Sequence, residues 1–300
     1  MLILNPVQVA LAAEILKRGE LVAFPTETVY GLGAPIFNPE AIRKIYLAKG
    51  RPSDNPLIAH ISSLDQIQQI AQEIPPEFNL LAQAFFPGPL TVVLKKHPSV
   101  PSIVSGGLDT IAVRMPSHPI ALELIKAVGE PIVAPSANLS GKPSSTMTQH
   151  VVDDFEGKIE AVLDGGPTQY GVESTVISLV GNPCLLRLGA VPKTALERVL
   201  NKPLGKATDQ SKRSSPGTRY RHYAPKASIR LFESEEEMET YLKTQCLHRW
   251  INPDLTVANL YAKLRQADDE DVEEIILCCS PKMRQNPVLM DRLLKASLTH

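Results

Sequence analysis

Apolar positions recur along the chain with two spacings. One is helical and predicts helices over residues 6–18, 38–49, 64–72, 76–85, 119–128, 148–155 and 192–200. The other is a short apolar run and predicts strands over residues 21–24, 57–61, 90–94, 110–114, 131–134, 159–163, 174–179 and 184–188. The polar, glycine-bearing residues 26–33 are expected to form a loop. Because helices separate the early strands but not the last three, we expect an α/β fold with a mixed sheet.

The periodic pattern is interrupted near residue 201. Residues 201–218 are rich in Lys, Ser, Gly and Pro, a composition typical of a linker. Beyond it, a small β-α-β-α tail is predicted by the patterns at residues 228–232, 234–244, 273–279 and 283–297. We therefore expect three parts, a main α/β domain, a linker and a small α/β domain, over residues 1–206, 207–226 and 227–300.

Composition and charge narrow the class of protein. The chain is 43% hydrophobic and 21% charged, as in soluble globular proteins, and its net charge is −1. A near-neutral chain offers no overall electrostatic case for binding nucleic acid. The four cysteines lack metal-ligand or redox spacing, and neither a signal peptide nor a membrane-spanning apolar segment is evident. We expect a cytoplasmic location without membrane contact.

The common short motifs of enzymes are missing. The sequence contains neither Gly-x-x-x-x-Gly-Lys-Ser/Thr nor Gly-x-Gly-x-x-Gly, the phosphate-binding patterns of P-loop and Rossmann proteins. It also lacks Gly-x-Ser-x-Gly and His-Glu-x-x-His. A triad hydrolase, a dinucleotide enzyme and a resident metal site are therefore not supported.

Two cations follow the second predicted helix, at Lys49 and Arg51. Gly50 and Pro52 shape the backbone between them and the next strand, so both charges can be held toward an anion such as a polyphosphate. An ordinary basic helix end, with Gly50 as the residue after the last turn, explains the same pattern.

Other polar groups stand in loops beside the predicted strands. Arg114 ends an apolar strand, where a charge requires an anionic ligand or a structural partner such as Asp109 or another acid. His60 ends another strand, where a structural histidine is also consistent. The Ser- and Asn-rich segment 134–145 can offer donors to phosphate or form a solvated turn.

The linker contains an unusual segment, Ser215-Pro-Gly-Thr-Arg-Tyr-Arg-His-Tyr-Ala-Pro225. Its rings and arginines can close over a nucleotide by stacking and ion pairing. An exposed basic linker or an RNA contact are the alternatives.

These segments together resemble the threonylcarbamoyl-AMP synthase family, the YrdC-like domain in its longer, two-domain form. The resemblance covers residues 1 to about 226 and rests on residues 25–33, Lys49-x-Arg51, Ser136-x-Asn138 and residues 215–225. It implies a twisted open sheet that encloses a large polar cavity. In this chain the tail is shorter than the usual second domain of this form.

The resemblance also implies a reaction. The family joins L-threonine, bicarbonate and ATP, with Mg²⁺, into threonylcarbamoyl-AMP and pyrophosphate, and uses no tightly bound cofactor. Downstream tRNA threonylcarbamoyl transferase proteins then modify the adenosine beside the tRNA anticodon, and a weak tRNA contact is possible. Such chemistry requires alignment and charge neutralisation more than a covalent nucleophile.

Matching positions imply roles for individual residues. Lys49 and Arg51 are the implied catalytic cations. The implied ATP-binding residues are Arg51, Asn55, Thr110, Ser136, Asn138, Ser144, Arg187 and Tyr223. The implied threonine-binding residues are Thr28, His60, Arg114 and Ser174, with Arg114 paired to the threonine carboxylate, and Thr110 fits either ligand. Pro135 stands where single-domain members often carry Thr, so one hydroxyl contact is missing or supplied elsewhere.

Two further hypotheses remain. A non-catalytic RNA-binding or ribosome-maturation module is the alternative function, although the near-neutral charge disfavours it. The linker is also a candidate lid that orders when a nucleotide binds.

Overall fold

The computed structural model describes residues 1–208, 223–243 and 248–297. It divides the chain into two compact units. The first comprises Met1–Ser140 and Ser145–Arg219, and the second comprises Gly141–Ser144 and Tyr220–His300. The sequence pattern gave no indication that the short segment 141–144 groups with the C-terminal residues.

The first unit is a helix-covered sheet. Its helices are α1 (Val9–Lys17), α2 (Pro39–Lys49), α3 (Ile67–Ile70), α4 (Pro76–Phe85), α5 (Pro119–Val128), α6 (Thr148–Phe155) and α7 (Lys193–Leu200), with 3₁₀ turns η1 (Pro6–Gln8), η2 (Leu64–Gln66) and η3 (Ser102–Ser105). Its strands are β1 (Leu2–Leu4), β2 (Val22–Phe24), β3 (Gly31–Pro35), β4 (Ile58–His60), β5 (Ala71–Gln72), β6 (Leu90–Lys96), β7 (Thr110–Arg114), β8 (Ile132–Val133), β9 (Ala161–Leu163), β10 (Thr175–Ser178) and β11 (Cys184–Arg187).

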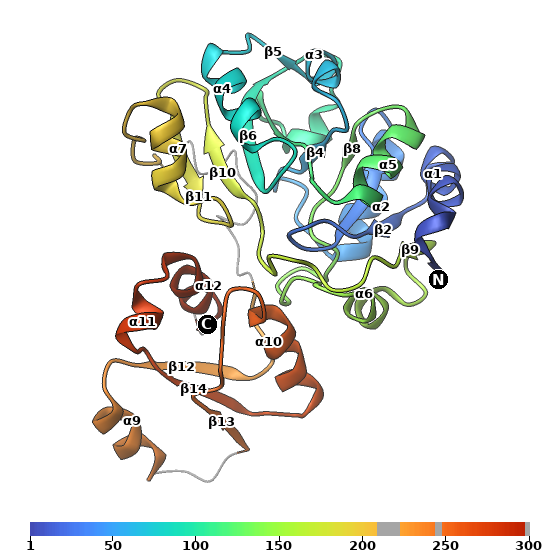
Figure 1. Ribbon diagram of the computed structural model, residues 1–300. Coiled ribbons are helices and arrows are strands. Elements are labelled where there is room, and N and C mark those ends of the chain that lie inside the picture. Colours follow the sequence, from blue (N-terminus) through green and yellow to red (C-terminus); the bar gives the residue numbers. More distant parts are fainter. Residues whose placement is uncertain (209–222, 244–247, 298–300) are drawn as a thin grey trace. The chain divides into compact units, whose positions relative to one another are not determined.

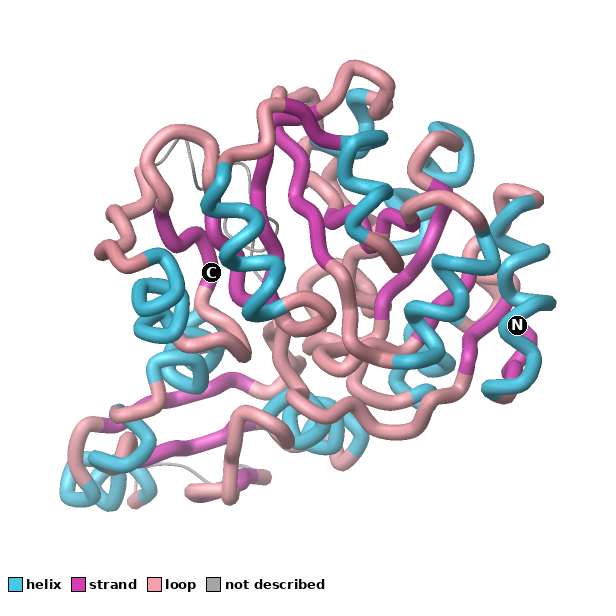
Figure 2. The backbone as a smooth tube through the Cα atoms, turned by 45° about the horizontal axis from the view of Figure 1, so that its top comes forward, coloured by secondary structure: helices cyan, strands magenta, loops and turns pink. Residues whose placement is uncertain are grey.

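These strands form one mixed sheet, as expected. Their order is β1-β9-β2-β3-β8-β4-β7-β6-β10-β11, with β5 paired to β6. Figure 2 shows the strands in magenta, lying beside one another. In the middle of the sheet, β4 is parallel to β7, whereas β8 is antiparallel to β4 and β6 is antiparallel to β7. This alternation decides which loops meet at each end of the central strands.

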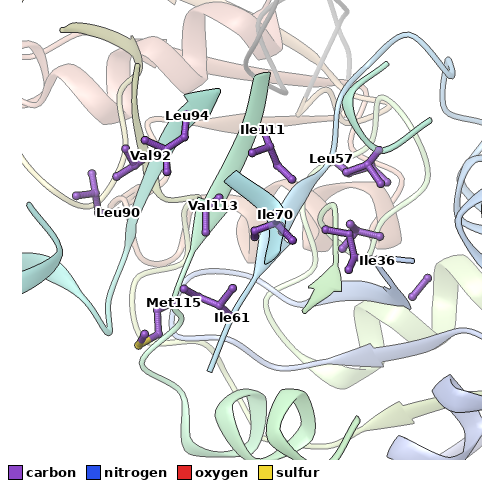
Figure 3. Close-up of a cluster of buried hydrophobic side chains, with 14 of the residues drawn as sticks. Ile36, Leu57, Ile61, Ile70, Leu90, Val92, Leu94, Ile111, Val113 and Met115 are labelled. Carbon is purple, nitrogen blue, oxygen red and sulfur yellow. The ribbon is translucent and has the colours of Figure 1, made fainter. Parts of the chain in front are cut away.

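The main core lies on one face of the sheet. On β6 and β7, alternate residues point to it, among them Leu90, Val92, Leu94, Ile111 and Val113 (Figure 3). Helices α2, α4, α6 and α7 contribute their apolar sides to the same core. The residues between these positions, such as Thr91 and Arg114, therefore face the opposite side of the sheet.

Helices cover that opposite side unevenly. Helices α1 and α5 pack together over β1, β9 and β2, where they close a second core (Figure 1). Over β4, β6, β7, β10 and β11 there is a smaller apolar cluster, whose described members lie on strands apart from Ala207. No described helix residue belongs to this cluster, so polar side chains of the central strands can gather beside it.

The second unit is built from a small parallel sheet and helices. A parallel sheet of order β12-β14-β13 is formed by β12 (Ser228–Phe232), β14 (Glu274–Cys278) and β13 (Arg249–Ile251). The helices are α9 (Glu235–Leu242), α10 (Leu260–Asp269), α11 (Pro281–Arg284) and α12 (Pro287–Ser297). The predicted β-α-β-α pattern missed β13 and α10 and merged α11 with α12.

Other element predictions need correction. Residues 31–35, expected to lie partly in a loop, form β3, because the antiparallel partners β2 and β8 on either side pair with this glycine-rich segment. The helix expected over 64–72 is a 3₁₀ turn and one helical turn followed by β5. Strand β1 was not predicted at all. No described helix is both long enough and apolar enough to span a membrane.

Candidate functional site

The strand directions sort the predicted site residues into two groups. Asn55 precedes β4, Thr110 begins β7, and Ser136 follows the antiparallel β8, so all three lie at one end of the central strands. His60 and Arg114 are aligned at the other end, where β4 and β7 finish. The two ends of β7 are about 13 Å apart at the usual rise per residue.

Lys49 is directed into the protein at the first end. Asn38 and Pro39 start α2, and Gly50 ends it in the left-handed conformation (φ 59°), as the sequence predicted. The Lys49 side chain is 3% exposed, and its Nζ donates to the carbonyl oxygens of Ser136 (2.6 Å) and Asn138. The structure therefore brings together three of the residues implied to bind phosphate and nucleotide.

The Ser136–Asn138 segment is itself tightly organised. The Ser136 hydroxyl donates to Asn138 Oδ1, and Asn138 Nδ2 donates to the Leu139 carbonyl at 2.7 Å. Arg51 folds back on its own loop, with Nε donating to the Asn55 carbonyl (3.3 Å) and Nη2 to the Pro56 carbonyl (2.9 Å). Arg51 and Asn55 thus form a neighbouring pair at the same end of the strands.

Behind α2 lies an open hollow of about 850 Å³. Its lining includes Lys44, Lys49, Leu139, Ser140 and Lys158. Of the residues predicted for the site, the hollow contains Lys49 alone. The hollow lies beside the Lys49 end of the site, and the other predicted site residues do not line it.

At the second end of the strands, Arg114 is buried and held on three sides. Its Nη1 donates to Thr28 Oγ1 at 2.8 Å, and its Nε donates to the Gly88 carbonyl at 3.4 Å. Its Nη2 lies 2.7 Å from Oε1 of Glu27 in an ion pair whose side chains are 4% and 3% exposed. Arg114 therefore has the structural acid that the sequence left open, and that acid is Glu27 rather than Asp109.

The loop that carries Glu27 and Thr28 is rigid for local reasons. The Thr26 hydroxyl accepts hydrogen bonds from the backbone of Thr28 (3.2 Å) and Val29 (3.3 Å) and lies 2.9 Å from the Thr28 hydroxyl. Side-chain hydroxyls stabilise turns in this way. The Glu27 carbonyl also accepts from Tyr170 N at 2.9 Å, so the loop is fixed from both sides.

His60 is an uncharged neighbour of Arg114. Burial and the positive charge of Arg114 lower the pKa of His60 to about 3, so the ring is neutral near pH 7. Its Nδ1 lies 3.1 Å from the Ile58 carbonyl, and its ring meets Phe24 edge-on. Around Arg114 the site therefore combines that cation with the Glu27 carboxylate, the neutral His60 imidazole and the Thr28 hydroxyl.

Ser174 and Arg187 meet at the same end. Strand β10 runs parallel to β6, which places Ser174 beside Thr91, with hydroxyls 2.7 Å apart. Arg187 donates through Nε (3.1 Å) and Nη2 (2.9 Å) to the Ser174 carbonyl. Arg187 was predicted to bind ATP. Its described contacts are instead with Ser174, which was predicted to bind threonine.

Two predicted residues belong to the second unit. Ser144 is buried, and the neighbouring Pro143 carbonyl accepts from Arg265 Nε (3.1 Å) and Nη2 (2.7 Å). Tyr223 stacks on Tyr261 with ring centres 5.2 Å apart, and the Arg292 guanidinium lies 5.0 Å from the Tyr223 ring centre. The rest of the linker motif, residues 215–222, lies outside the described residues.

Comparison with known proteins identifies the relatives of the chain. A family model described as "Telomere recombination" matches residues 14–189, and one described as "Threonylcarbamoyl-AMP synthase, C-terminal domain" matches residues 191–297. The chain belongs to the threonylcarbamoyl-AMP synthase family. The enzyme of that name from Pyrococcus abyssi is 52% identical over 77% of this chain and 69% of its own length. The Bacillus subtilis enzyme is 41% identical over 98% of this chain and 94% of its own length.

Solved structures agree with this assignment. A variant of P. abyssi Sua5 superposes with a TM-score of 0.91 at 41% identity, covering 99% of this chain and 96% of that one. P. abyssi Sua5 complexed with L-threonine gives a TM-score of 0.88, covering 99% and 98%. E. coli YciO gives 0.58 at 26% identity, covering 64% and 96%.

Sequence reasoning missed one charged residue that contacts a predicted site residue. Glu27 stands inside the segment 25–33 that supported the resemblance, yet it was not assigned a role. A usable signal was present, because an acid between two threonines directly after a buried strand is poorly solvated and needs a cation. Glu27 belongs beside Arg114 in any account of this site.

Proposed function

We propose that this chain joins L-threonine, bicarbonate and ATP into threonylcarbamoyl-AMP and pyrophosphate. Membership of the threonylcarbamoyl-AMP synthase family supports the assignment. The structural observation that supports it most is the placement of two buried cations, Lys49 and Arg114, near opposite ends of the same strands. A polyphosphate and an amino-acid carboxylate each require a cation, and their reacting groups must meet between them.

The reaction needs two bond-forming steps. The threonine amine attacks the carbon of bicarbonate, water leaves, and a carbamate forms. A carbamate oxygen then attacks the α-phosphorus of ATP, and the bond to the β-phosphate breaks to release pyrophosphate. Neither step requires a protein nucleophile, and the family site contributes cations, hydroxyls and a neutral imidazole that hold the substrates in line.

We assign ATP to the end of the strands that carries Lys49, Arg51, Asn55, Ser136 and Asn138. Thr110 lies at the same end, so its hydroxyl is assigned to ATP rather than to threonine. Ser144 and Tyr223 remain proposed ATP contacts. Their support is the family motif, and the catalytic roles of Lys49 and Arg51 have the same basis.

We assign threonine to the end that carries Arg114. The guanidinium receives the threonine carboxylate, and Thr28, His60 and Ser174 surround the remaining groups. The neutral state of His60 supports this assignment, because a second cation beside Arg114 would oppose the approach of the threonine ammonium group. Arg187 supports Ser174 through its two hydrogen bonds to the Ser174 carbonyl.

Mg²⁺ is proposed to arrive with ATP. Among the described residues there is no group of three or more His, Cys, Asp or Glu side chains that could hold a metal ion. Mg²⁺ commonly binds through substrate phosphates with few protein ligands, which suits such a site. The product is proposed to pass to tRNA threonylcarbamoyl transferase proteins in the cytoplasm, with at most a weak tRNA contact by this chain.

Pyrophosphate release tests the proposal. The purified chain is supplied with ATP and Mg²⁺, and threonine and bicarbonate are omitted in turn. We expect release to require both. Equal release without threonine would contradict the substrate assignment, and tight tRNA binding without any nucleotide turnover would favour the alternative of an RNA-binding module.

A further inference from the structure

Glu27 is the unusual charge of the site. Its side chain is 3% exposed, and neither carboxylate oxygen has a hydrogen-bond partner among the described residues. Its described ion-pair partner is Nη2 of Arg114 at 2.7 Å, and its negative charge also favours the protonated form of His118. A buried carboxylate without hydrogen bonds costs free energy, so Glu27 and Arg114 depend on each other for compensation.

The same contacts leave part of Arg114 available. A guanidinium has five N–H donors. Two N–H groups of Arg114 donate described hydrogen bonds, one from Nε and one from Nη1, and Nη2 lies against Glu27 in the ion pair without a hydrogen bond of its own. The other N–H group of Nη1 and those of Nη2 have no hydrogen-bond partner in the described part of the chain, and bidentate binding of a carboxylate takes one N–H group from each terminal nitrogen.

Glu27 and Nη2 of Arg114 are enclosed together. Both Glu27 oxygens and Nη2 are inaccessible to solvent, so water compensates neither charge and the ion pair determines how Nη2 is oriented. The Glu27 backbone is fixed by Tyr170, and the adjacent Thr28 hydroxyl holds the other side of the guanidinium. Glu27 therefore holds the Arg114 guanidinium from a rigid loop.

We propose that Glu27 is a positioning residue for the threonine substrate. It fixes the plane and the direction of the Arg114 guanidinium, so that N–H groups of Nη1 and Nη2 without hydrogen-bond partners are presented together to an incoming α-carboxylate. This inference rests on the proposed function, because it takes Arg114 as the group that receives that carboxylate. It predicts that Glu27 affects threonine binding and leaves ATP binding unchanged.

The test compares Glu27→Gln, Glu27→Asp and the wild-type chain by pyrophosphate release, with threonine and ATP varied separately. Glu77→Gln is the matched control, because it removes the ion pair with Lys202 elsewhere in the first unit. In Glu27→Gln we expect the KM for threonine to rise about tenfold or more, with the KM for ATP within about twofold. Glu27→Asp, which keeps the charge but withdraws it by one methylene, should show a smaller rise.

A double-mutant cycle tests whether Glu27 acts through Arg114. In an Arg114→Lys background, adding Glu27→Gln should change the KM for threonine by less than about twofold. Far-UV circular dichroism checks folding, and if Glu27→Gln is unfolded, Glu27→Asp carries the same comparison. An unchanged KM for threonine in an active Glu27 variant, or equal rises for threonine and ATP, would overturn the inference. A wild-type chain without threonine-dependent release would instead refute the proposed function.

Discussion

At the scale of single residues, the two buried cations of the site are held in different ways. Lys49 donates to two backbone carbonyls, whose dipoles stabilise its charge. Arg114 is paired with Glu27, so the charge of the pair is already balanced. A balanced pair suits a substrate with no net charge, such as an amino acid.

Lys49→Ala tests the first of these cations. The loss of Nζ removes the proposed phosphate contact and two hydrogen bonds that hold the Ser136–Asn138 segment. We expect turnover to fall about 100-fold or more, because a charged group aimed at developing charge typically contributes that much. Lys44→Ala on the same helix is the control, since it removes a part-exposed pair with Glu20 and a hydrogen bond to the Gly19 carbonyl, away from the Ser136–Asn138 segment. Similar steady-state rates for the two variants would contradict the role of Lys49.

His60 provides a prediction about pH. Its pKa is about 3 in the folded protein, below the ordinary value of 6.5, so the unfolded chain binds one more proton between these pH values. The free energy of unfolding should therefore be fully retained above pH 6.5 and fall as pH drops toward 3, by on the order of 1.4 kcal/mol per pH unit from this group.

Urea unfolding at pH 7 and pH 5 checks this expectation. In His60→Gln the difference between the two pH values should shrink relative to the wild type. The comparison is needed because burial also lowers the pKa of His118, which adds a change of the same sign in both proteins. Equal pH dependence in the two proteins would show that His60 does not titrate in this way.

At the scale of elements, the position of Ser174 depends on the close packing of Gly189 against the backbone around it. A Cβ on Gly189, just after β11, would lie 2.4 Å from the Glu173 carbonyl oxygen and 2.4 Å from Thr175 N. Both atoms belong to backbone, so a side chain there cannot fit unless the segment around Ser174 moves. Ser174 is thus positioned by Arg187 of β11 on one side and by the close approach of Gly189 on the other.

Gly189→Ala tests that arrangement. We expect the KM for threonine to rise about tenfold, because Ser174 is displaced by a backbone shift at the substrate end of the site. Gly181→Ala, in the turn between β10 and β11, is the matched control; it has a positive φ but open space around its Cβ. Both variants should lose stability, as thermal unfolding will show, but only Gly189→Ala should alter threonine kinetics.

The elements also show what the sequence can and cannot predict. The start and the end of helix α2 were predictable, because Asn38, Pro39 and Gly50 are local signals whose effect needs no distant partner. Strand β3 was not, since Gly31 and Gly33 have little strand preference and are ordered by β2 and β8 from far along the chain. The sequence could indicate that Glu27 needs a cation, but not that the cation is Arg114, which is 87 residues away and meets it only in the folded protein.

At the scale of the whole molecule, the mixed sheet divides the proposed chemistry between the two ends of its central strands. The alternation along β6 and β7 sends apolar residues to the main core and leaves Thr91 and Arg114 on the other face. That alternation was visible in the sequence, whereas the reversal of β6 and β8 relative to β4 and β7 was not. The reversal separates the group assigned to ATP from the group assigned to threonine.

Tyr223 connects the linker motif to the C-terminal unit. This residue of the linker motif stacks on Tyr261 and lies under Arg292, so it anchors the end of the linker within the second unit. If the linker is a lid for the nucleotide, Tyr223→Ala in the full chain should raise the KM for ATP about tenfold by releasing that end. Tyr241→Ala, which alters an aromatic contact of β12 in the same unit, is the control. An unchanged KM for ATP in Tyr223→Ala would refute the lid, as would a fully active chain lacking residues 207–300.

The most direct measurement of the central claim is the product itself. The wild-type chain is incubated with ATP, Mg²⁺, L-threonine and ¹³C-labelled bicarbonate, and the nucleotides are analysed at once by mass spectrometry. The account predicts a threonylcarbamoyl-AMP species that carries the label and disappears when threonine or bicarbonate is left out. Unlabelled product, or AMP formed at the same rate without threonine, would contradict it.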